Sequence, residues 1–256
     1  MLTAITRPVS PAIVGCELTH LSRSPIDVNT AAAQHAAYER ALEELGCRIV
    51  RLALAPDLPD SVFVEDAAVV LDEVAVMTRP GAASRRAEVP AVAEALAALR
   101  PLRAIEAPGT LDGGDVLRAG RRLFVGRSSR TNDEGIRQLR SIAAAFDYDV
   151  VAVAPEGCLH LKSAVTEVRP GLLLLNPEWV AASMFPGLEC VEVDPAEPSA
   201  ANVLPVGNGW IYPSAFPVTL ARLERQGIRP TLVDVSELAT AEGAVTCCSV
   251  IVPVPH

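Results

Sequence analysis

The sequence predicts an α/β fold in which five ββαβ units form a ring, as one domain over residues 1–256. Short β-like runs alternate with amphipathic segments, and polar residues recur at strand ends 42 to 48 residues apart. A repeat of about 40 to 50 residues indicates an array of similar units. Strand pairs combined with one helix fit neither an all-β propeller nor a helical array. No Pro-, Ser- or Gly-rich linker divides the chain, so one domain is expected.

Four segments have the apolar periodicity of amphipathic helices. The first begins at Asn29-Thr30, and Gly46 is the residue expected just after its end. The others are a segment around 89–99, one opening with the capping-box pattern Thr131–Glu134, and one that follows Pro217 and ends at Gly227. Each of these helices is expected to fall between strands of the repeat.

Eight runs rich in β-branched and aliphatic residues are typical of short strands. They are Ala67–Leu71, Val74–Thr78, Arg122–Val125, Val150–Val153, Ala164–Val168, Leu172–Leu175, Trp210–Tyr212 and Ala244–Val252. The regularly spaced polar residues at strand ends are Asp66, Asp112, His160, Asn202 and Cys247. Equivalent strand ends of a ring converge near its centre, so these five residues are expected to share one pocket.

Composition and charge exclude several classes of protein. With 50% hydrophobic and 21% charged residues, the chain is neither disordered nor collagen-like. A net charge of −9 argues against a nucleic-acid partner and suits a small cationic ligand. The first twenty residues lack signal-peptide features, and no run reaches the ~18 apolar residues of a membrane span, which predicts a cytoplasmic protein. The six cysteines show no repeated CxxC spacing and predict neither disulfides nor structural zinc.

The adjacent residues Cys247 and Cys248 provide a candidate nucleophile. They follow Glu242–Thr246 and open a run that is typical of a strand. Rigid backbone at a strand end can present a thiolate for attack, although free cysteine is also among the most buried residue types. Successive strand residues point to opposite faces, so only one of the two is expected to face the pocket.

Carboxylates and a histidine precede other strands. Asp60, Glu65 and Asp66 have no neighbouring Lys or Arg in the segment, a pattern that suits a metal ion, a guanidinium or a merely solvated turn. Asp112 lies in a turn with two glycines and could orient a histidine, as the third member of a nucleophile–base–acid set. His160 precedes another strand and is either that base or a structural residue.

Arg85 and Arg130 lie in loops that lead from a strand towards a helix. Two such side chains could clamp a substrate carboxylate, because a guanidinium pairs with it bidentately. Each could equally be solvated.

Six strings, taken together and in order, resemble a known family: FVED, TRPGAxSRR, LDGGDVL, VGxSxRTN, LHLKS and TCCSV. They resemble the dimethylarginine dimethylaminohydrolases, guanidino-group-modifying enzymes with the five-bladed α/β propeller called the pentein fold. The resemblance spans roughly residues 58 to 252. It implies hydrolysis of Nω-methylated L-arginine, such as asymmetric dimethylarginine or monomethylarginine, to L-citrulline and a methylamine. The reaction would pass through a covalent cysteine thiouronium and need no cofactor and no metal.

The resemblance also implies residue roles. Cys247 would be the nucleophile, His160 the general acid and then base, and Asp112 the carboxylate that orients His160. Cys248 would then belong to the core. The substrate-binding residues would be Glu65 and Asp66 for the guanidinium, Asp60 and main-chain oxygens near Leu18 and Ala241 for the α-amino group, and Arg85 and Arg130 for the α-carboxylate.

Two alternatives remain at this point. One is another guanidine-modifying enzyme of the same fold, namely an arginine deiminase, an agmatine deiminase or an amidinotransferase, although two candidate carboxylate-binding arginines disfavour agmatine. The other is a non-enzymatic pentein that resembles a ribosome-associated initiation factor. Its scaffold would have no need of Cys247, His160 and two acids at equivalent repeat positions. The resemblance is also compatible with a homodimer.

Overall fold

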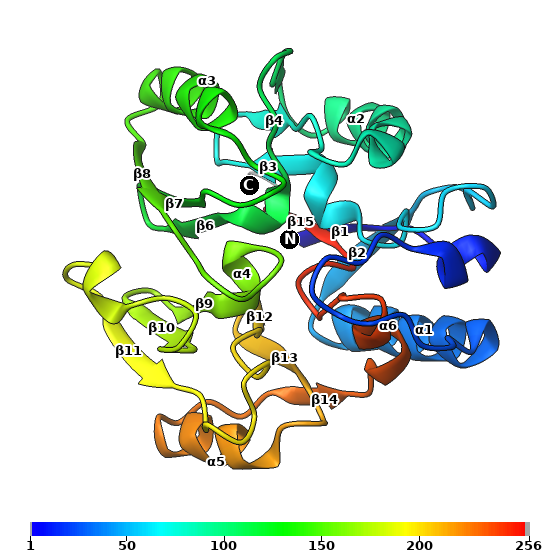
Figure 1. Ribbon diagram of the computed structural model, residues 1–256, viewed down its shortest axis with the longest axis vertical. Coiled ribbons are helices and arrows are strands. Elements are labelled where there is room, and N and C mark those ends of the chain that lie inside the picture. The colour runs from blue at the N-terminus through cyan, green and yellow to red at the C-terminus, as the bar shows by residue number, and fades with distance from the viewer. Residues whose placement is uncertain (1, 254–256) are drawn as a thin grey trace.

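In the computed structural model, the described residues 2–253 form five three-stranded sheets arranged in a ring (Figure 1). Each sheet has the same topology, in which the central strand pairs antiparallel with the first strand and parallel with the third. A parallel third strand requires a crossover, and helices provide most of these crossovers. This arrangement confirms the predicted five-bladed α/β propeller.

Four blades follow one another in the middle of the chain. The first contains β3 (Ala68–Val70), β4 (Ala75–Met77), α2 (Val89–Ala97) and β5 (Leu102–Ala104), and the second contains β6 (Val116–Ala119), β7 (Arg122–Gly126), α3 (Asp133–Ala144) and β8 (Asp149–Val153). The third contains β9 (Val165–Arg169), β10 (Leu172–Leu175), the 3-10 turn η5 (Ala182–Met184) and β11 (Glu189–Glu192). The fourth contains β12 (Leu204–Val206), β13 (Gly209–Pro213), α5 (Pro217–Arg225) and β14 (Thr231–Val233).

The fifth blade joins the two ends of the chain. It combines β15 (Val250–Pro253) with β1 (Leu2–Thr6), α1 (Val28–Glu44) and β2 (Cys47–Arg51). β15 runs antiparallel to β1 in a register from Leu2 opposite Pro253 to Ile5 opposite Val250. In Figure 1 these two strands lie side by side near the middle of the ring, so the closing strand brings the segment before it to the axis.

Apolar side chains fill the junctions between neighbouring blades. Leu123 and Ile136 of the second blade pack with Val76 of the first, for example, and Phe124 meets Phe185 of the third blade edge-to-face at 4.9 Å. Five such clusters occur among the described residues, one at each junction. Full burial of one such side chain contributes about 1.5–3 kcal/mol, so the blades are held rigidly against one another.

The four predicted helices are confirmed as α1, α2, α3 and α5, with one cap corrected. Gly46, directly after α1, has a φ of 86°, as expected for the residue that ends a helix. The predicted capping box starting at Thr131 is wrong, because Asn132 is the N-cap and accepts from the Gly135 N–H at 2.8 Å. The Thr131 hydroxyl instead accepts from the Asp112 N–H at 3.1 Å. Thr131 thereby supports a site residue.

The predicted run Ala244–Val252 is a strand only from Val250 onward. Residues 245–248 form a turn, in which the Cys247 N–H donates to the Ala244 carbonyl oxygen at 3.1 Å. The alternation argument for Cys247 and Cys248 is therefore wrong, because neither residue lies in a strand. The other seven predicted runs each contain a strand. The strand expected after the Asp112 turn is β6. The strands that the sequence analysis did not identify are β1, β2, β5, β11, β12 and β14, most of them short edge strands.

Gly113 shows how closely neighbouring blades approach near the axis. It begins the 3-10 turn η4 (Gly113–Asp115), which packs against η2 (Val64–Ala67). A Cβ atom at position 113 would lie 2.0 Å from the Glu65 carbonyl oxygen and 2.8 Å from that of Ala68. Only glycine fits there without moving the backbone of the adjacent blade.

We expect Gly113→Ala to lower the free energy of unfolding by about 1–3 kcal/mol, because the added methyl group forces the two blades apart. Urea unfolding followed by circular dichroism measures this change. Gly15→Ala is the matched control, since a Cβ atom there meets nothing within 4 Å. Equal stabilities of the two variants would contradict this account of the blade junction.

Candidate active site

The five regularly spaced polar residues each lie just before the first strand of a blade. Asp66 is in η2 before β3, Asp112 precedes η4 and β6, and His160 is the N-cap of the short helix α4 (Leu161–Ala164) before β9. Asn202 and Cys247 precede β12 and β15. Asp66, His160 and Cys247 line one cavity, and Asp112 lies directly behind His160. The expectation that all five share one pocket is wrong for Asn202, which does not line this cavity and instead contacts the turn that carries Cys247. The ring therefore assembles a site from residues far apart in sequence.

His160 is buried between two carboxylates. Its Nε2 lies 3.1 Å from Asp112 Oδ2, and its Nδ1 lies 3.8 Å from Asp66 Oδ1. Burial alone lowers the pKa of His160, but the carboxylates of Asp66, Asp112 and Asp115 outweigh it and raise the pKa to about 9. The imidazole is thus a proton donor at neutral pH, held in place by Asp112.

Cys247 lines the same cavity as His160. Burial, and then the carboxylates of Glu65 and Asp66, raise the pKa of the Cys247 thiol well above its usual range. The thiol is therefore protonated in the free protein and needs a nearby positive charge to ionise. Cys248 is fully buried, and its thiol donates to the Ala244 carbonyl oxygen at 3.6 Å. Cys248 lies in the core, as the sequence analysis expected.

Arg85 belongs to a buried ion cluster. Its Nη1 lies 2.5 Å from Asp66 Oδ2, and its Nε and Nη2 donate to the Glu88 carboxylate at 3.2 and 2.9 Å. Burial opposes a charged Asp66, but His160 and Arg85 outweigh it and lower the pKa of the Asp66 carboxyl. Arg85 lines the cavity, yet these two acids already hold its guanidinium. Glu88 was not identified from the sequence, and only its position three residues after Arg85 could have indicated it.

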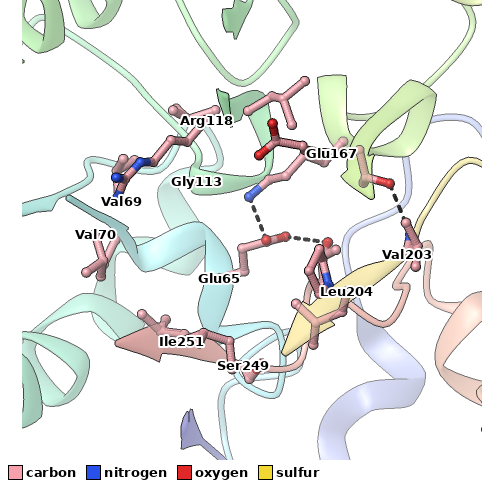
Figure 2. A pocket seen from close by; sticks show the side chains of 18 residues that line it. Glu65, Val69, Val70, Gly113, Arg118, Glu167, Val203, Leu204, Ser249 and Ile251 are labelled. Carbon is pink, nitrogen blue, oxygen red and sulfur yellow. Dashed lines mark hydrogen bonds and ion pairs between the residues drawn. The ribbon is translucent and has the colours of Figure 1, made fainter. Parts of the chain in front are cut away.

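The remaining predicted binding residues lie around the cavity, with two exceptions. Asp60, Arg130 and Ala241 line it, together with Glu17, Phe63, Leu159, Glu242 and Gly243. Leu18 is half-buried and packs on the core beside the cavity wall. Glu65 does not line this cavity, and its carboxylate accepts from Lys162 Nζ at 2.5 Å and from the Thr246 hydroxyl at 2.9 Å. Figure 2 shows this carboxylate in a different cavity.

A loop from the N-terminal segment covers the cavity. The Glu242 carboxylate accepts from the backbone N–H groups of Thr19, His20 and Leu21, at 2.6 to 3.1 Å. The Asp60 carboxylate accepts from the Glu17 N–H at 3.2 Å, and Arg130 donates to the Thr19 hydroxyl at 3.1 Å. The cavity has a volume of only about 20 Å³, close to the volume that a single water needs. Binding of a larger molecule therefore requires this loop to move.

Asp66, Asp112 and His160 also offer three potential metal-ligating atoms within 4.8 Å of one another. Each of these side chains already has a partner: Asp66 accepts from the Gly114 N–H at 2.9 Å, and Asp112 accepts from the Gly81 N–H at 2.9 Å. The cluster is accounted for as a histidine oriented by two acids. Among residues 2–253, no helix combines the length and the apolar character that a membrane span requires.

Comparison with known proteins settles the family. No protein-family model matches the chain. The N(G),N(G)-dimethylarginine dimethylaminohydrolase of Streptomyces coelicolor is 43% identical over 249 residues, which are 96% of this chain and 95% of that protein. The chain belongs to the dimethylarginine dimethylaminohydrolase family. The Pseudomonas aeruginosa dimethylarginine dimethylaminohydrolase is 36% identical over 246 residues, which are 94% of this chain and 95% of that one.

Solved structures agree with this family. A cysteine-to-serine variant of the Pseudomonas aeruginosa dimethylarginine dimethylaminohydrolase, complexed with citrulline, superposes with a TM-score of 0.94 at 34% identity, over 98% of this chain and 100% of that one. A histidine-to-glycine variant, present as an adduct with S-methyl-L-thiocitrulline, gives a TM-score of 0.93 at 34% identity, with the same coverage. The expected family and its hydrolase class are confirmed.

The raised pKa of His160 has a consequence for stability. Because that pKa is about 9 in the native protein and about 6.5 in an unfolded chain, the ion pairs of His160 contribute fully below pH ~6.5. Their contribution disappears as the pH rises through about 9. We expect the free energy of unfolding to fall more steeply between pH 6.5 and 9 in the wild type than in His160→Gln. Urea titrations at several pH values measure both slopes, and parallel slopes would contradict a charged native His160.

Proposed function

We propose that this member of the family hydrolyses Nω-methylated L-arginine to L-citrulline and a methylamine, with Cys247 as the nucleophile. One observation supports this most strongly: Cys247 and a His160 held by Asp112 line one small cavity whose walls also carry Asp60 and Asp66. A guanidinium remains protonated up to pH ~12, so it needs such an acidic cavity.

The bound cation activates the nucleophile. Acids near Cys247 raise the pKa of its thiol in the free protein, and a guanidinium placed against the same acids lowers it again. The thiol loses its proton to solvent, and the thiolate attacks the guanidinium carbon and forms a C–S bond. His160 donates its proton to the departing methylamine as the C–N bond breaks. Neutral His160 next takes a proton from water, whose oxygen attacks the thiouronium carbon. As the C–S bond breaks, the proton of the added hydroxyl passes to the departing sulfur, which releases citrulline and restores the Cys247 thiol.

The substrate's amino-acid end is proposed to occupy the other part of the cavity. Asp60 and the main-chain oxygens near Leu18 and Ala241 would receive the α-amino group, and Arg130 with Arg85 would hold the α-carboxylate. Arg130 is the better placed arginine, because its guanidinium donates to the neutral Thr19 hydroxyl and not to a carboxylate. Asp66 would hold the guanidinium, and Glu65 would contribute from behind the cavity wall. We propose that the protein acts on a small cationic substrate and that it does so in the cytoplasm.

A product assay with several substrates tests this function. Purified protein is incubated separately with asymmetric dimethylarginine, monomethylarginine, arginine and agmatine, and citrulline, methylamines and ammonia are measured. We expect citrulline and the matching methylamine from the first two substrates. Citrulline from arginine alone would indicate an arginine deiminase, and no product from any substrate would contradict the enzymatic function.

Substitution of each cysteine by serine distinguishes the role of Cys247 from that of Cys248. Cys247→Ser should abolish turnover, because a serine hydroxyl does not ionise beside these acids. Cys248→Ser should retain most of the activity, since its hydroxyl can replace the hydrogen bond that the thiol donates to Ala244. Initial rates with asymmetric dimethylarginine, with circular dichroism as the folding control, measure both effects. An inactive but folded Cys248→Ser would reverse the assignment.

A further inference from the structure

Asn202 has no part in the proposed reaction, although it occupies the repeat position of the catalytic residues. It is 3% exposed and does not line the Cys247 cavity. Its Oδ1 accepts from the Thr246 N–H at 3.1 Å, and its Nδ2 donates to the Thr246 hydroxyl and to the Lys162 carbonyl oxygen, both at 3.0 Å. Asn202 therefore connects the residue before Cys247 with the residue two positions after His160.

The same two residues meet again at Glu65. The Thr246 hydroxyl donates to Glu65 Oε2 at 2.9 Å, and Lys162 Nζ donates to Glu65 Oε1 at 2.5 Å. The Glu65 N–H donates to the Cys247 carbonyl oxygen at 3.1 Å. Glu65, Lys162, Asn202 and Thr246 thus form a closed ring of hydrogen bonds, which we call the axial brace. Its members come from four different blades, so it fixes the Cys247 turn relative to most of the ring.

The axial brace lies on the other side of a thin wall from the reacting groups. Three of its members line a second cavity of about 250 Å³ on the ring axis, and their near neighbours in sequence line the Cys247 cavity. The pairs are Glu65 with Asp66, Lys162 with His160, and Thr246 with Cys247. Figure 2 shows the Glu65 side chain in this axial cavity, joined to its two partners by dashed lines.

This arrangement has an electrostatic consequence. A carboxylate close to a cysteine disfavours its thiolate, and a cation that pairs with the carboxylate reduces that effect. Lys162 is the ammonium that pairs with Glu65, at 2.5 Å, and it lines the axial cavity rather than the Cys247 cavity. Both oxygens of Glu65 are engaged, so the carboxylate is held in the axial cavity and kept from turning towards the thiol.

We propose that Lys162 and Asn202 are positioning residues of the Cys247 site: Lys162 holds and neutralises Glu65, and Asn202 fixes the turn that presents Cys247. This proposal rests on the proposed function only in taking Cys247 as the nucleophile. Neither residue touches the substrate. Their effect is on how readily Cys247 forms a thiolate and on where the sulfur lies.

The role of Lys162 can be tested on the thiol without any substrate. The rate of Cys247 alkylation by iodoacetamide is measured against pH, with the modified peptide quantified by mass spectrometry. We expect Lys162→Met to react about tenfold more slowly at pH 8, because the unpaired Glu65 opposes the thiolate. The double variant Lys162→Met/Glu65→Gln should recover the wild-type rate. An unchanged profile in Lys162→Met, or no recovery in the double variant, would overturn the proposal.

If Lys162→Met does not fold, the single variant Glu65→Gln tests the same electrostatic effect. It removes the acid and leaves the ammonium, so its alkylation profile should move to lower pH. An unmoved profile would also overturn the proposal. Iodoacetamide carries no guanidinium, so these results stand even if methylarginine proves not to be the substrate. Failure of the proposed function would instead appear in the product assay.

Asn202→Ala tests whether Asn202 fixes the turn that presents Cys247. We expect kcat to fall roughly 10- to 100-fold with KM within about threefold, because a displaced turn misplaces the sulfur but leaves the binding residues intact. Asn176→Ala is the matched control: Asn176 is 2% exposed and also donates to a backbone carbonyl, but it lies outside the axial brace. Equal loss of kcat in the two variants, or a change in KM alone for Asn202→Ala, would show a merely structural role.

Discussion

The pairing of β15 with β1 is the constraint on which the rest of the structure depends. It joins the two ends of the chain into the fifth blade and so closes the ring. Without this closure the turn at Cys247 would have no fixed relation to Asp66, Asp112 or His160, which come from other blades. The closely packed junctions between the blades then hold these four residues in fixed positions relative to one another.

Charge balance at the axis is the second organising feature. Asp66, Asp112 and Asp115 surround His160, while Glu65 pairs with Lys162 and Glu88 pairs with Arg85. So many buried carboxylates are stable only when cations pair with them. The protein supplies the imidazolium of His160, the guanidinium of Arg85 and the ammonium of Lys162. In the proposed reaction a positively charged substrate completes this balance, whereas the free site keeps the Cys247 thiol protonated. On that mechanism, selectivity for a cation and activation of Cys247 are two effects of the same field.

The sequence predicted the parts of this molecule that depend on repetition and local pattern. The interval between Asp112, His160 and Cys247 predicted both the ring and the convergence of these residues, and the apolar periodicity predicted four helices. Short edge strands such as β5 and β11 have mixed exposure and no clear alternation, so local pattern did not reveal them. Pairings across the ring, including Lys162 with Glu65 and Glu242 with Thr19, depend on tertiary geometry that no spacing in the sequence encodes.

The central claim is that Cys247 forms a covalent bond with the carbon of a methylated guanidinium. Rapid mixing with asymmetric dimethylarginine, followed by acid quench and mass spectrometry, tests it most directly. The account predicts a transient adduct on the Cys247 peptide, with the mass of the substrate less dimethylamine, that disappears as citrulline forms. Citrulline production with no adduct at any time, or an adduct on a different residue, would contradict the account.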